Sequence, residues 1–164
     1  MDSDASKASA MEAIFKRFHP RVCRLAFALC GHPTEAEDIA QEVFVAVLRG
    51  IDGFRGEAEL GTWIYRITTR VAGRHVARRG RVMTHVIDTE GFAGGSDAET
   101  DAQLAELAAA MDTLSIPLRT VLSLVAIEGL SHEAVADVLG VPVGTVWSRL
   151  YNARRQLAEA MAHG

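Results

Sequence analysis

Apolar residues recur along most of this chain at the three- and four-residue spacing of an amphipathic α-helix. The clearest stretch opens with Thr34 and Glu37, which form a capping box. Its apolar positions Ile39, Val43 and Val47 then follow at one-turn intervals. The same spacing predicts helices over residues 10–30, 34–48, 62–79, 100–114, 117–128, 131–139 and 143–161. Alternating β-type runs are scarce, so the pattern predicts an all-α protein.

Two features interrupt this helical pattern. Pro20 lies inside the first stretch and predicts a kink or a short break. From Gly80 to Ser96 the helical period disappears, and acidic residues follow. This composition predicts a flexible acidic linker over residues 81–103. The fold class expected is therefore all-α, with two small helical modules, residues 1–80 and 104–164, joined by that linker.

The second module contains the signature of a helix-turn-helix. Ser131 is placed to cap a short helix, and Gly140 supplies a left-handed residue that ends it. Pro142 prevents continuation, and Val146 and Leu150 begin the apolar stripe of a following helix. Two helices around such a turn are the arrangement that lays one helix in the DNA major groove, although helical hairpins also serve as plain structure.

The composition predicts a folded protein that does not insert into a membrane. Among 164 residues 49% are hydrophobic, which supports a buried core. No apolar run approaches the ~20 residues of a membrane span, and the acidic start lacks a signal-peptide core. We therefore expect a cytoplasmic protein with no membrane insertion. Cys23 and Cys30 lie about 10 Å apart along one helix, too far for a disulfide, and their spacing with His19 and His32 fits no zinc pattern.

The basic residues are unevenly distributed. Residues 1–79 carry 12 basic and 10 acidic side chains, whereas residues 105–164 carry 4 and 6. Arg66, Arg70, Arg74 and Arg78 follow one another at four-residue intervals, with Trp63 and Tyr65 close by. Such a row of arginines favours contact with phosphates, and the two aromatic residues are available to stack on exposed bases. Pairing with Asp or Glu of the same module is the alternative.

The remaining polar positions favour binding over catalysis. The helix of residues 34–48 carries, opposite its core stripe, Asp38, Gln41, Glu42 and Val45. This face is either a solvated surface or, because of Val45, a site for a protein partner. The six histidines are scattered, and no nucleophile or paired carboxylate accompanies them. We expect no enzyme, no cofactor, no metal and no small-molecule substrate.

Taken together, these motifs resemble the extracytoplasmic-function (ECF) family of bacterial RNA polymerase sigma factors, within the sigma-70 superfamily. Residues 36–44 look like the segment that docks on the polymerase clamp. Phe54 and residues 62–67 look like the segment that melts the promoter and reads its −10 element. Residues 129–131, 141–146 and 148–150, with Ala153 and Arg154, look like the helix-turn-helix that reads the −35 element.

The resemblance implies a role for each surface. Asp38, Gln41, Glu42 and Val45 would bind core RNA polymerase, whose clamp and flap regions are the expected partners. The −10 region would be held by Trp63, Arg66, Arg70, Arg74 and Arg78. The −35 region would be contacted by Thr145, Trp147, Ser148, Arg149, Asn152 and Arg155. An anti-sigma factor would restrain the protein.

The chain departs from the family pattern at three of these positions. The family often has Asn where this chain has Arg70, Lys where it has Trp147 and Arg where it has Asn152. Two missing cations on the second module predict weaker non-specific DNA affinity. Two other functions remain open: a stand-alone helix-turn-helix regulator, and a sigma mimic that titrates an anti-sigma factor by protein contact.

Overall fold

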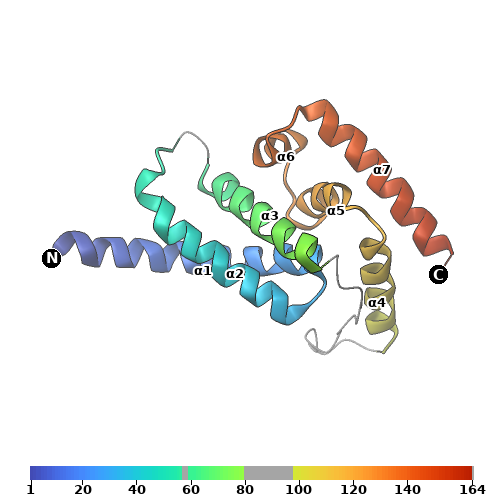
Figure 1. Ribbon diagram of the computed structural model, residues 1–164, viewed down its shortest axis with the longest axis horizontal. Coiled ribbons are helices and arrows are strands. Elements are labelled where there is room, and N and C mark those ends of the chain that lie inside the picture. The colour runs from blue at the N-terminus through green and yellow to red at the C-terminus, as the bar shows by residue number, and fades with distance from the viewer. Residues whose placement is uncertain (57–58, 80–97, 164) are drawn as a thin grey trace.

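The computed structural model describes residues 1–56, 59–79 and 98–163, and the regular elements within these ranges are all helical (Figure 1). The first unit contains α1 (Asp2–Cys30), α2 (Pro33–Gly50), a 3-10 turn (Ile51–Gly53) and α3 (Leu60–Arg79). The second unit contains α4 (Ala98–Asp112), α5 (Ile116–Leu122), a π-helical turn (Ser123–Ile127), α6 (His132–Leu139) and α7 (Val143–Ala162). The all-α prediction is confirmed.

Of two local predictions about helix limits, the capping box at Thr34 is wrong, and of the kink or short break expected at Pro20 the break does not occur. Helix α1 continues through Pro20 without a break. Because Pro20 is exposed, water can satisfy the carbonyl that loses its amide partner there. Helix α2 begins at Pro33, with His32 as its N-cap, so Thr34 already lies inside the helix and caps nothing. Proline at the first helical position is pre-organised for the helix, and this decides the start.

The segment between the two units is partly helical. Helix α4 begins at Ala98, so residues 98–103, which we assigned to the linker, belong to a helix. The rest of the predicted linker, residues 81–97, lies outside the described residues.

The helix-turn-helix prediction is confirmed in its details. The Ser131 hydroxyl oxygen accepts a hydrogen bond from the Ala134 amide at 3.1 Å and caps α6. Gly140 ends α6 with φ +65°, a left-handed conformation that a Cβ would strain. Val146, Leu150 and Ala153 form the buried side of α7.

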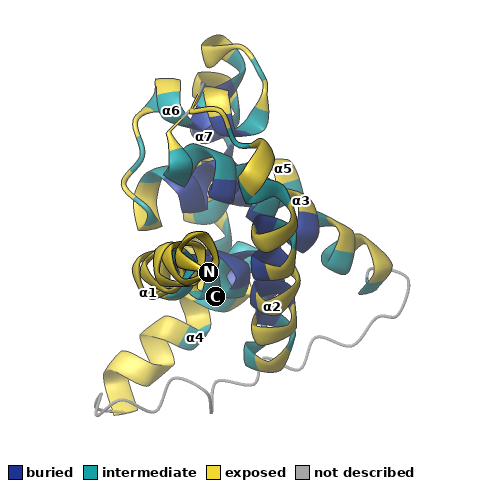
Figure 2. Cartoon of the chain, turned by 90° about the vertical axis from the view of Figure 1, so that its left-hand side faces the viewer, coloured by how far each residue is buried: buried dark blue, intermediate teal, exposed yellow. Residues whose placement is uncertain are grey.

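One continuous core joins the two units. Phe18, Val22 and Leu25 of α1 pack with residues of α2 and α3, while Val121 and Leu124 do the same among α5–α7. Figure 2 shows the buried positions concentrated where α2, α3 and α5 lie, with α4 mostly exposed. Helix α3 contacts α2 on one side and α6 on the other (Figure 1). None of the described helices combines the length and the apolar character needed to cross a bilayer.

Candidate nucleic-acid interface

The arginine row of α3 is divided among different neighbours. The Arg66 guanidinium donates to the Asp137 carbonyl of α6 at 2.7 Å. The Arg74 guanidinium donates to Glu42 of α2 at 3.1 Å. Arg70 and Arg78 are exposed, and within the described ranges Arg70 has no hydrogen-bond or ion-pair partner. Pairing inside the module, the alternative to phosphate contact, is therefore realised for Arg74.

Glu42 is the acidic centre of this surface. It also hydrogen-bonds to the His75 ring at 2.7 Å. The hydrogen bond from His75, helped by the charges of His75, Arg74 and Arg78, lowers the pKa of Glu42. Glu42 thus remains ionised and connects the face of α2 to the arginine row of α3.

The aromatic residues near the start of α3 are less available for base stacking than the sequence predicts. Trp63 is half-buried, and its ring centroid lies 5.1 Å from that of Phe54. The Trp63 ring also packs against Gly50, where an added Cβ would lie only 2.9 Å from the ring. Tyr65 is buried, and its hydroxyl donates to Glu128 at 2.8 Å. Tyr65 is therefore not free to stack on a base in this arrangement.

The polar face of α2 is open to solvent. Asp38, Gln41, Glu42 and Val45 are all exposed. Val45 exposes 46% of its surface between polar neighbours on one face. The face thus presents an apolar centre with acidic residues around it, as a protein-binding surface would.

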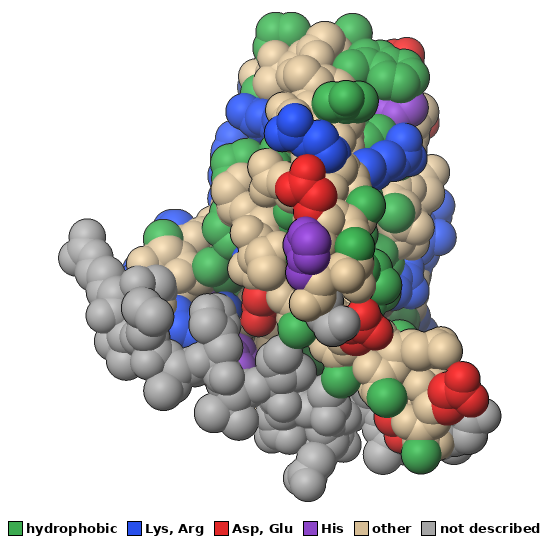
Figure 3. Space-filling view, turned by 90° about the vertical axis from the view of Figure 1, so that its right-hand side faces the viewer, with side chains coloured by type: hydrophobic (Ala, Val, Ile, Leu, Met, Phe, Trp, Pro, Cys, Tyr) green, Lys and Arg blue, Asp and Glu red, His purple; other side chains and the backbone are tan. Residues whose placement is uncertain are grey.

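Helix α7 presents a mixed aromatic and polar surface. Trp147 is 55% exposed, and its ring stacks on His132 of α6 with centroids 3.9 Å apart. The Ser148 hydroxyl donates to the Thr145 carbonyl. Asn152 is partly buried and Arg155 is exposed. On the side of the molecule in Figure 3, Lys and Arg side chains lie mostly across the upper part and acidic ones mostly below them.

A buried carboxylate joins the two units. Glu128, at the end of the π-helical turn, accepts two hydrogen bonds from the Arg24 guanidinium of α1, at 2.9 and 3.0 Å, and one from the Tyr65 hydroxyl of α3. Its side chain is only 1% exposed. The hydrogen bond to Glu128 raises the pKa of Arg24, and burial followed by the same carboxylate raises the pKa of Tyr65 to about 12.

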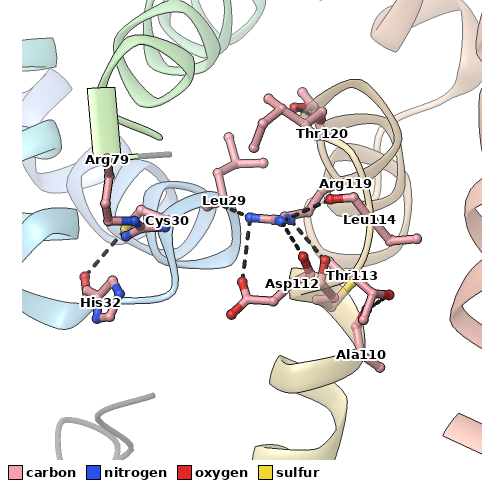
Figure 4. A network of polar contacts seen from close by, with 12 residues as sticks. Leu29, Cys30, His32, Arg79, Ala110, Asp112, Thr113, Leu114, Arg119 and Thr120 are labelled. Atoms are coloured by element: carbon pink, nitrogen blue, oxygen red, sulfur yellow. Dashed lines mark hydrogen bonds and ion pairs between the residues drawn. The ribbon is translucent and has the colours of Figure 1, made fainter. Parts of the chain in front are cut away.

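Arg119 of α5 makes a second junction between the units. It is 5% exposed and donates to carbonyl oxygens of Met111, Asp112 and Leu114 in its own unit and to the Leu29 carbonyl of α1 (Figure 4). The Leu29 carbonyl is one of the last of α1, which has no basic residue in its final turn. Arg119 therefore supplies the cation that favours the C-terminal end of a helix.

These junctions bring the two predicted DNA-binding helices together. Arg66 and Arg70 of α3 and Arg149 of α7 line the same pocket, of about 390 Å³. The local sequence does not indicate this convergence, nor the contacts of Glu128 and Arg119. No local signal identifies them, because Glu128 lies 104 residues from Arg24 and Arg119 lies 90 residues from Leu29.

The two units match separate parts of one family of known proteins. Residues 14–82 match the model of Sigma-70 region 2, and residues 104–157 match that of Sigma-70, region 4. The RNA polymerase sigma-H factor of Pseudomonas aeruginosa is 32% identical, over 93% of this chain and 86% of its own length. The ECF RNA polymerase sigma-E factor of Haemophilus influenzae is 34% identical, over 90% of this chain and 85% of its own length. The ECF sigma factor SigE of Mycolicibacterium smegmatis is 32% identical over 97% of this chain, which spans 64% of that relative.

Two solved structures share the fold. One is the sigma factor RpoE of Bartonella quintana in complex with the anti-sigma factor NepR, with a TM-score of 0.72 and 23% identity over 92% of this chain and 96% of that chain. The other is CnrH in complex with the cytosolic domain of CnrY, with a TM-score of 0.74 and 24% identity over 95% of this chain and 90% of that chain. At these identities the similarity concerns the arrangement of helices.

Proposed function

Because this chain belongs to the extracytoplasmic-function family of RNA polymerase sigma factors, we propose that it binds core RNA polymerase and directs it to specific promoters. The observation that carries the proposal is the presence of both matched regions in order, one with an arginine helix and the other with a helix-turn-helix. In this role the protein carries out no catalysis, uses no cofactor and works in the cytoplasm.

The division of labour follows the two units. Residues 1–80 form the unit for polymerase and the −10 element, and the unit from residue 104 onward reads the −35 element. The intervening residues 81–103 connect them, with α4 already begun at Ala98. The polymerase contact is assigned to Asp38, Gln41, Glu42 and Val45, because this face of α2 is exposed and combines an apolar centre with acidic neighbours.

For the −10 region we assign the row Arg66, Arg70, Arg74 and Arg78, with Trp63 as the aromatic at its start. Arg78 is exposed, so a phosphate can reach it without breaking an existing hydrogen bond, whereas Arg70, also exposed, lines the pocket shared with α7. Arg66 and Arg74 exchange a carbonyl and a carboxylate for phosphate when DNA binds.

For the −35 region we assign residues on the solvent side and the inner side of α7: Thr145, Trp147, Ser148, Arg149, Asn152 and Arg155. Trp147 is held by its stack on His132 and can offer an apolar contact in the major groove. Arg149 faces the pocket shared with α3. Both DNA-reading helices therefore engage separate promoter elements only after the two units move apart.

An anti-sigma factor is the partner that we propose for regulation. The two relatives of similar fold were solved as complexes, one with the anti-sigma factor NepR and one with the cytosolic domain of CnrY. The exposed faces of α2 and α7 give such a partner two surfaces to cover. Covering either one would block polymerase or promoter binding.

Run-off transcription with core RNA polymerase and genomic promoter fragments tests the function. Specific initiation that depends on this protein is the expected result. Duplex binding without any initiation would instead identify a stand-alone regulator, and tight anti-sigma binding with no DNA activity would identify a mimic. Val45→Asp should weaken core binding, while Ala13→Asp, on an exposed position of α1, serves as the matched control.

A further inference from the structure

The pocket between the two units is lined by basic residues on an otherwise largely apolar surface. It has a volume of about 390 Å³ and is lined by α3, by the N-terminal half of α5, by the end of α6 with its turn, and by α7. Its lining contains three arginines, Arg66, Arg70 and Arg149, and no acidic residue. The hydroxyls of its two threonines, Thr69 and Thr120, already donate to carbonyls of their own helices.

The charge of this pocket is uncompensated. Arg66 is held by the neutral Asp137 carbonyl, and neither Arg70 nor Arg149 has a hydrogen-bond or ion-pair partner in the described part of the chain. Three cations around one cavity repel one another, and the repulsion opposes the packing of the units. An anion bound between the three arginines would attract each of them and so stabilise the packing of the two units. The planar guanidinium fork suits phosphate in particular, because it can donate two parallel hydrogen bonds.

The size and the remaining lining define the ligand further. The pocket has the volume of a small-molecule site. Apart from the arginines and threonines, its lining is apolar or glycine, with Ile116, Val138 and Leu139 among the contributors. Apolar walls with a few convergent charges are typical of sites for compounds that carry a phosphate group on a less polar body.

We propose that the pocket between α3, α5, α6 and α7 is a binding site for a small phosphate-bearing anion, which Arg66, Arg70 and Arg149 hold together. The three arginines come from both units, so the complete site exists only when the units are packed together. The anion therefore stabilises the closed arrangement by its own binding free energy.

This site also has a consequence for promoter binding, which rests on the proposed function. The same three arginines are assigned to promoter DNA, and they reach separate promoter elements only when the units are apart. A ligand that binds the closed form must then weaken DNA binding, and DNA must weaken ligand binding by the same factor.

Direct binding of inorganic pyrophosphate to the full chain tests the site, by calorimetry and by the shift in thermal midpoint, without polymerase or DNA. Wild-type protein should bind at millimolar or lower concentration and melt at higher temperature with the ligand. Arg149→Ala should weaken binding about tenfold or more, because a bidentate charged contact is lost. Arg154→Ala removes an equal charge from an exposed position of α7 outside the pocket and should leave affinity within about twofold.

A second pair of variants avoids the arginines. Pro117 is exposed, lies in the first turn of α5 and lines the pocket. Pro117→Glu places a carboxylate beside the anion and should weaken pyrophosphate binding, whereas Pro117→Gln, of the same shape, should not. Absence of binding to wild type, or equal losses in the paired variants, would overturn the site. Pyrophosphate binding by a protein that fails in run-off transcription would overturn the proposed function alone.

Discussion

Glu128 is one of the contacts that hold the two units together, and its replacement by glutamine should make them separate more often. The carboxylate accepts two hydrogen bonds from Arg24 and one from Tyr65, both in the first unit. Glutamine keeps the size of the side chain but loses the charge, and its amide nitrogen can accept none of these bonds. The variant therefore weakens a contact between units without opening a cavity.

The expected loss follows from the burial of the pair. A hydrogen bond to a charged group contributes about 1.5–3 kcal/mol when it is buried. The Glu128 side chain is 1% exposed, but the Arg24 side chain is 48% exposed and solvent screens it. We therefore take the lower end, about 1.5 kcal/mol, which corresponds to a roughly tenfold increase in the open population.

Affinity for a promoter duplex, measured by fluorescence anisotropy at fixed salt, reports this population. If only the open form binds DNA, the apparent DNA affinity is proportional to the fraction of protein in that form. As long as the open form is rare, a tenfold rise in its population should raise the apparent affinity about tenfold. Glu106→Gln is the control, because it removes the same charge from an exposed position of α4. Because Tyr65 donates to Glu128, Tyr65→Phe should cost less stability in Glu128→Gln than in wild type. Equal DNA affinities for Glu128→Gln and Glu106→Gln would refute the reasoning.

Three further predictions concern stability, measured by urea unfolding. Gly140→Ala should destabilise by about 1 kcal/mol because of its φ of +65°, whereas Gly144→Ala, in open space inside α7, should be neutral or stabilising; similar losses would contradict the left-handed cap. Arg119→Met leaves four carbonyls without their donor and should cost about 3 kcal/mol, against almost nothing for exposed Arg154→Met. Tyr65 has its pKa raised to about 12 by burial and by its hydrogen bond to Glu128, so the stability that it contributes is present below about pH 10 and lost as the pH rises towards 12. Tyr65→Phe should remove this alkaline loss, and an unchanged pH profile would contradict it.

The local pattern of the chain determined its helices and the helix-turn-helix. Periodicity, the Ser131 cap and the Gly140 turn depend on residues within one or two turns of each other, so each could be predicted without the fold. The predictions that failed were also local. At Thr34 a capping signal competed with the adjacent Pro33, which decided where the helix begins. At Pro20 the expected break does not occur, because solvent can satisfy the exposed carbonyl.

The charged surfaces were predicted in part. The sequence placed four arginines on one side of α3 and four polymerase-binding candidates on one face of α2, and the structure leaves that face of α2 exposed. The sequence did not indicate that Arg74 pairs with Glu42 in particular, because that contact depends on how α2 packs against α3.

Only the tertiary structure decided how the two units meet. The contacts of Glu128 with Arg24 and of Arg119 with Leu29 join residues 104 and 90 positions apart, and helical periodicity carries no information at that distance. The same packing withdraws Tyr65 from solvent and places arginines of both helices that we propose to bind DNA around one pocket. The sequence by itself thus determined which surfaces this protein has, and the packing of its two units decided which of them face solvent and which face each other.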